Sequence, residues 1–151
     1  MGIWQKRAIY SALVAVIAAA GFLAAGFSGD GPAGMAEDTA RRNVAAVFVA
    51  FGIFTNLIVR YITRHRPDDP RTIVDERDRS IHRAAFEIAL WVTVTVVFFG
   101  CLLLHELNLE TGIISVNWVW FLGYGTLLLA NLGWSIPALV MYAGVGGRAE
   151  G

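Results

Sequence analysis

Residues 84–104 read AAFEIALWVTVTVVFFGCLLL, and this stretch decides the class of the fold. Only one residue in it, Glu87, carries a charge. An α-helix rises 1.5 Å per residue, so a run of about 20 apolar residues crosses the roughly 30 Å hydrocarbon core of a bilayer. The stretch is therefore predicted to form a membrane-spanning helix.

The rest of the chain repeats this pattern. The further apolar runs cover residues 8–27, 44–62 and 116–142. Lys6 and Arg7 before the first run resemble the start of a signal peptide, but a signal core is only about 7–15 residues long, so we expect an uncleaved helix. Of all residues, 56% are hydrophobic and 16% charged, which departs from soluble domains. The predicted fold is an all-α four-transmembrane-helix bundle in which residues 1–151 form a single membrane domain.

The distribution of positive charge predicts the orientation. The formal net charge is zero, which disfavours direct binding of nucleic acid. Of the twelve Lys and Arg residues, Arg41 and Arg42 lie between the first two runs, and the other ten lie near the N-terminus, around the loop 63–83 or at the C-terminus. Because cytoplasmic loops are rich in Lys and Arg, both termini and this loop are predicted to be cytoplasmic, in a prokaryotic cytoplasmic membrane.

The charged loop contains its own helix signal. Asp75 and the acids after it suit a helix N-terminus. Val74, Ile81 and Ile88 recur every seven residues, which indicates one apolar stripe running from the loop into the third membrane helix. We therefore expect one continuous helix from Asp75 to Leu104 that projects roughly 15 Å into the cytoplasm.

Residues 74–84, VDERDRSIHRA, form a charged motif between the second and third membrane runs. With the four-helix layout, the motif resembles a family of small four-helix integral membrane proteins of unknown function. These share Asp-Glu-Arg-Asp or Asp-Glu-Arg-Glu, followed by Ile and by a basic residue with Ala. The resemblance implies the fold and the topology but no reaction.

The charges of this motif have two interpretations. In the structural one, the acids cap the helix and the arginines meet lipid phosphates or pair along the helix. In the functional one, the motif docks a cytoplasmic protein or a neighbouring subunit, since a lipid-binding patch needs cations alone. The candidate partner-binding residues are Asp75, Glu76, Arg77, Asp78, Arg79 and Arg83.

Polar residues inside the apolar runs form a second candidate site. The residues are Glu87, Asn56, Asn117, Tyr124, Asn131 and Ser135. The four in the last run share one helix face, which we expect to turn away from lipid and to bond to neighbouring helices or to line a polar pathway. Glu87 is expected to pair with Arg60 or Arg83, because an ionised carboxylate near lipid is costly.

Other residues carry packing expectations. Trp4, Trp118 and Trp120 suit the membrane interface, whereas Trp91 and Trp134 are expected to pack against other helices. The glycine-rich stretch 28–43 is predicted to be a flexible loop. Small residues in the first run, among them Ala18, Ala19, Gly21 and Ala25, should let that helix approach a neighbour closely.

Catalytic and metal-binding patterns are absent from the sequence. It contains no Ser-His-Asp set, phosphate-binding glycine loop or His-Glu-x-x-His pattern, and its single Cys101 lies in an apolar run. No cofactor or metal is expected. The leading hypothesis is a non-enzymatic accessory or signalling subunit that contacts membrane lipids and either another protein or copies of itself. The alternative is a small oligomeric transporter or channel that uses the polar face.

Overall fold

The computed structural model describes residues 2–64 and 76–146. Within them lie four long α-helices and one short 3-10 helix: α1 (Ile3–Phe27), η1 (Pro32–Ala36), α2 (Thr39–Ile62), α3 (Glu76–Leu107) and α4 (Val116–Gly146). No strand occurs in the described ranges. All four α-helices are long and apolar enough to cross a membrane, which fits an integral membrane protein. The all-α four-helix prediction is therefore confirmed.

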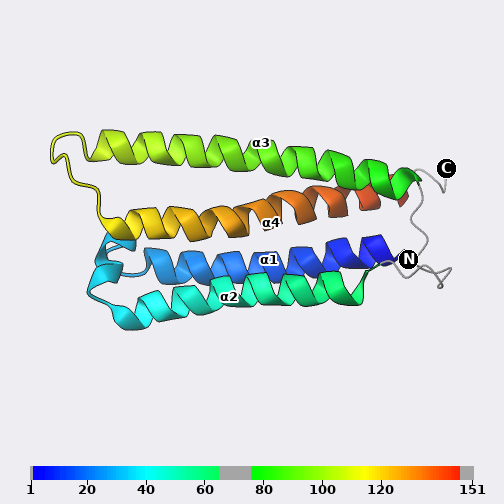
Figure 1. Ribbon diagram of the computed structural model, residues 1–151, viewed down its shortest axis with the longest axis horizontal. Helices are drawn as coiled ribbons and strands as arrows, with labels where there is room; N and C mark the ends of the chain where they lie inside the picture. The colour runs from blue at the N-terminus through cyan, green and yellow to red at the C-terminus, as the bar shows by residue number, and fades with distance from the viewer. Residues whose placement is uncertain (1, 65–75, 147–151) are drawn as a thin grey trace.

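The helices form two antiparallel hairpins that lie side by side. Helix α1 packs on α2, helix α3 packs on α4, and α1 and α4 join the hairpins, as Figure 1 shows. Helices α2 and α3 therefore occupy the two edges. Helices α1 and α3 begin, and α2 and α4 end, at one end of the bundle, which we call the Arg7 end.

Small side chains allow α1 to occupy the centre. Its buried residues include Ala8, Ala12, Ala15, Ala18 and Ala19. At Gly21 a Cβ atom would collide with the ring of Phe48 on α2, so only glycine fits there. Gly52 on α2 also lies close to α1, because a Cβ there would stand 2.9 Å from that of Ala18. The predicted close approach of the first helix is confirmed.

An aromatic pair joins α1 to α4. The rings of Phe22 and Phe121 stack at 4.6 Å between centroids with an interplanar angle of 15°. Phe22 is only 1% exposed, and Gly26 gives the Phe121 ring the space that a Cβ would fill. This stack is the centre of the larger of the two buried clusters, with Met35, Val49 and Leu128 around it.

The stretch between α1 and α2 differs from the predicted flexible loop, because it contains η1 and packs on the bundle. Met35 of η1 is 1% exposed. The Arg41 guanidinium donates hydrogen bonds to the carbonyl oxygens of Ala25, Gly26 and Gly31. Asp38 caps α2 by accepting from the Arg41 backbone N–H at 3.0 Å. One arginine thus ties the end of α1 to the start of α2.

Helix α3 is continuous from Glu76 to Leu107, as predicted, while Val74 and Asp75 lie outside the described residues. The expected seven-residue stripe is wrong in part, because Ile88 is 39% exposed. Ile81, Ala85 and Ala89 form the buried face against α4 instead. That face is centred on Ala85, and Ile88, three positions further along the helix, lies at the edge of the face.

Candidate functional site

The start of α3 presents most charges of the motif at the surface of the Arg7 end. Glu76, Arg77, Arg79 and Arg83 are exposed. Their side chains make no hydrogen bond or ion pair with any part of the chain that the structure describes. The expected pairing along the helix is therefore not formed. Asp75 lies outside the described residues.

Asp78 is the exception in the motif, because it faces the bundle. The Tyr142 hydroxyl donates to Asp78 Oδ1 at 2.7 Å, which joins the start of α3 to the end of α4. Ile81, one turn further on, is buried in the same cluster as Tyr142. These contacts fix the orientation of the first α3 turns, so the four exposed charges are held on a defined outer face.

The end of α2 is capped by a side chain from α1. Arg7 Nε donates to Thr63 Oγ1 at 2.8 Å, and Arg7 Nη2 donates to the carbonyl oxygens of Thr63 and Arg60. A guanidinium suits the carbonyl-rich C-terminal end of a helix because it satisfies unpaired acceptors there. The Arg7 guanidinium also lies 4.4 Å from the centroid of the Trp4 ring.

His82 lies between two tryptophans from different helices. Its ring centroid is 4.2 Å from that of Trp4 on α1 and 5.2 Å from that of Trp134 on α4, with which it stacks at 23°. Both ring nitrogens of His82 are buried and have no hydrogen-bond partner among the residues that the structure describes. A neutral imidazole carries one donor and one acceptor, so this site has unused hydrogen-bonding capacity.

Trp4 and Trp134 therefore have a structural role. Trp134 packs between helices, as predicted. Trp4 was expected to act only as an interface residue, but its ring also packs against that of His82 at an interplanar angle of 58°. Trp91 does not pack between helices and is 65% exposed, so its prediction is wrong. The position of Trp91 in the sequence indicated its depth in the apolar run, but it did not indicate the direction in which the side chain points from α3.

A cationic cleft of about 440 Å³ opens beside His82. Arg7, Arg60 and Arg83 line it together with the rings of Trp4, His82, Phe86 and Trp134. The Arg60 guanidinium lies 5.7 Å from the Trp134 ring centroid and, like that of Arg83, makes no hydrogen bond or ion pair within residues 2–64 and 76–146. No acidic side chain from the described residues lines the cleft.

A second cleft continues the first one along α3. It has a volume of about 490 Å³ and shares Arg60, Phe86 and Trp134 with the cationic cleft. Its other lining residues are mostly apolar: Ala89, Leu90, Thr93, Leu127, Ala130 and Asn131. We call the cationic cleft the head cleft and its continuation the tail groove.

Glu87 does not form the predicted ion pair. Ala85 and Ala89 face α4, and Glu87 between them points to the opposite side of α3, where it is exposed beside Ile88 and Trp91. No hydrogen bond or ion pair joins Glu87 to a described residue, including Arg60 and Arg83. The prediction fails because adjacent positions on a helix point about 100° apart, and Glu87 falls on the outward face.

Three of the other intramembrane polar residues bond within their own helix instead of to another α-helix. Asn56, Asn131 and Ser135 each donate to the carbonyl oxygen four residues earlier in their own helix. Asn117 donates to the Ala33 carbonyl of η1, and Tyr124 is an exposed residue beside Trp120. Short side chains reach the preceding turn of their helix easily, which explains why the expected bonds between α-helices are not formed.

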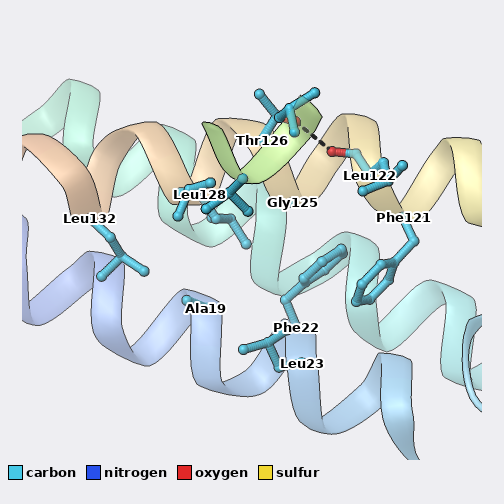
Figure 2. Close-up of a pocket in the computed structure, with 12 residues that line it drawn as sticks. Ala19, Phe22, Leu23, Phe121, Leu122, Gly125, Thr126, Leu128 and Leu132 are labelled. Atoms are coloured by element: carbon cyan, nitrogen blue, oxygen red, sulfur yellow. Dashed lines mark hydrogen bonds between the residues drawn. The ribbon is translucent and has the colours of Figure 1, made fainter. Parts of the chain in front are cut away.

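A third cleft, about 210 Å³, lies between α1, α3 and α4 and is almost entirely apolar (Figure 2). Phe22 and Leu23 line it from α1, and Phe121 lines it from α4. Thr126 contributes the one hydroxyl, which already donates to the Leu122 carbonyl at 2.7 Å. This cleft offers packing surface but no group for polar recognition.

The sequence did not indicate that Arg7, Arg60 and His82 would meet. The three residues come from different helices, and only the packing of the two hairpins brings them together. The sequence did show that all three residues lie at the same end of their apolar runs, and this was the one indication that they could be neighbours. Among the described residues, no group of three or more His, Cys, Asp and Glu side chains is placed to hold a metal ion.

Comparison of the chain with models of protein families, with curated proteins and with solved structures found no match.

Proposed function

We propose that the protein is a non-enzymatic membrane subunit that binds a cytoplasmic protein partner through the outer face of the start of α3. The observation that carries this proposal is the set of four exposed charges that pair with no described residue, Glu76, Arg77, Arg79 and Arg83, in the first turns of α3. The positive-inside distribution of Lys and Arg supports a cytoplasmic location for this face.

The mixture of charges favours a protein as the partner. Charges of both signs on one face provide electrostatic complementarity, which selects a partner and sets its register. Asp78 adds little to this face because it is engaged by Tyr142, so it contributes to positioning. A helix held by Asp78 and Ile81 presents its outer charges without further ordering, which lowers the entropic cost of binding.

Photocrosslinking tests the proposal. A photoreactive amino acid at Arg79 should capture one defined protein in cells, whereas the same group at Lys6, an exposed cation of α1 near the same end, should not. The double substitution Arg77→Glu and Arg79→Glu should lower the affinity for that protein at least about tenfold, since it juxtaposes like charges. Equal capture at both sites, or unchanged affinity of the double variant, would refute the docking function.

A small oligomeric transporter is the second candidate, and the exposed carboxylate of Glu87 is the observation that favours it. Because a carboxylate facing lipid is costly, a neighbouring copy would be needed to cover it, and any pathway would lie between copies. Proton or ion flux in liposomes that is lost in Glu87→Gln would support this function. A monomeric protein without flux would exclude it.

A further inference from the structure

We propose that the head cleft binds the phosphate of an anionic membrane phospholipid and that the tail groove holds one of its acyl chains. The head cleft and the tail groove share Arg60, Phe86 and Trp134, so one molecule can occupy both. This site shares Arg83 with the exposed outer face of α3 but otherwise uses residues that the outer face does not include.

The charge of the head cleft selects an anion. Arg60 and Arg83 make no hydrogen bond or ion pair with the described chain, and Arg7 adds a third positive charge although its donors are engaged at the end of α2. A guanidinium matches the geometry of a phosphate group, which can accept two hydrogen bonds side by side. An anion in the cleft therefore offsets a concentration of positive charge in a cleft that no acidic side chain among the described residues lines.

His82 is an unpartnered polar residue at the same place. Its two buried nitrogens have no partner, and its ring lines the head cleft. A buried polar group without a partner is destabilising unless water or a ligand satisfies it. Because both nitrogens are covered in the structure, a phosphate oxygen can accept a hydrogen bond from the imidazole N–H only after the ring turns toward the cleft, so the free arginines carry the preference for an anion.

The depth of the two clefts indicates a lipid as the source of the phosphate. Arg83 directly precedes the apolar run 84–104, which places the head cleft at the level expected for lipid headgroups. From Phe86 to Thr93 the tail groove extends about 10 Å further along α3, at 1.5 Å per residue. Basic pockets between membrane helices on the cytoplasmic side are a general form of anionic lipid site.

Native mass spectrometry of the full chain in mild detergent tests the site. Dioleoyl phosphatidylglycerol should be retained in preference to dioleoyl phosphatidylcholine. Arg60→Gln should weaken the retention of phosphatidylglycerol about fivefold, because one arginine near an anionic lipid surface is worth roughly that factor. Arg79→Gln also removes one positive charge near the Arg7 end, but Arg79 lies on α3 outside the cleft, so this variant should leave retention unchanged.

Two further measurements separate the possible outcomes. If Arg60→Gln melts earlier than the parent protein, Arg83→Gln replaces it, because Arg83 is exposed and should weaken retention similarly without a folding cost. Inorganic phosphate at the lipid concentration should not displace phosphatidylglycerol, since it cannot occupy the tail groove. Displacement by inorganic phosphate, equal retention of the two lipids, or an equal effect of Arg79→Gln would each overturn the proposal.

Discussion

Substitution of Phe22 by alanine should destabilise the joint between the two hairpins. Phe22 is 1% exposed and stacks on Phe121, so truncation leaves a cavity between α1 and α4. In lipid, separated helices keep their apolar surface in an apolar medium, so the transfer term largely disappears and the packing term remains. A cavity of roughly 100 Å³ at about 24 cal/mol per Å³ corresponds to about 2.4 kcal/mol.

This loss can be measured as a melting temperature. For a chain of this size, about 2.4 kcal/mol corresponds to a decrease in Tm of about 5–10 °C. Thermal unfolding in mild detergent, followed by circular dichroism, gives the value for Phe22→Ala. The matched control is Phe54→Ala, because Phe54 on α2 is 65% exposed and should change Tm by no more than about 2 °C. Equal shifts for the two variants would refute the argument that this stack joins the hairpins.

Three further outcomes are expected. In a cysteine-free background, a cysteine at Ser80 should react with an impermeant thiol reagent only from the cytoplasmic side, and one at Glu110 only from the other side; reaction of both from one side would disprove the topology. Glu87→Leu should leave Tm within about 2 °C of the parent value because no described residue pairs with Glu87, and a much larger decrease would reveal a partner. Gly52→Ala should lower Tm because the new Cβ would lie 2.9 Å from the Cβ of Ala18. Gly123→Ala has open space around it and should raise Tm slightly, because alanine has the better helix propensity. A change of the same sign in both variants would contradict the close packing of α1 on α2.

The number of helices followed directly from the sequence because each apolar run is long enough to cross a bilayer. The helix ends were less accurate, since backbone hydrogen bonds extend a helix beyond its apolar part. Helix α1 begins at Ile3 where the apolar run begins at residue 8, and α2 begins at Thr39, next to its Asp38 cap, where the run begins at residue 44.

The site was harder to predict because it depends on which helices are neighbours. Hydropathy and spacing give the depth of Glu87 and of His82, but the direction of a side chain depends on the face that its helix buries. That face follows from the pairing of α3 with α4 and of α1 with α4, which no local pattern specifies. The prediction that the charges at the start of α3 form a surface did not depend on which helices are neighbours, and these charges are exposed in the structure.

The central position of α1 implies a reversal of the usual relation between side-chain size and tolerance to mutation. Its buried residues are mostly alanines, whereas the large side chains of α3, such as Phe98 and Leu103, are exposed. In a saturation library, adding a single methyl group to an inward alanine should be more harmful than exchanging a bulky outward residue for another apolar one. Descendants of this chain should therefore drift rapidly in the volume of α3 residues while α1 stays constrained to the smallest ones.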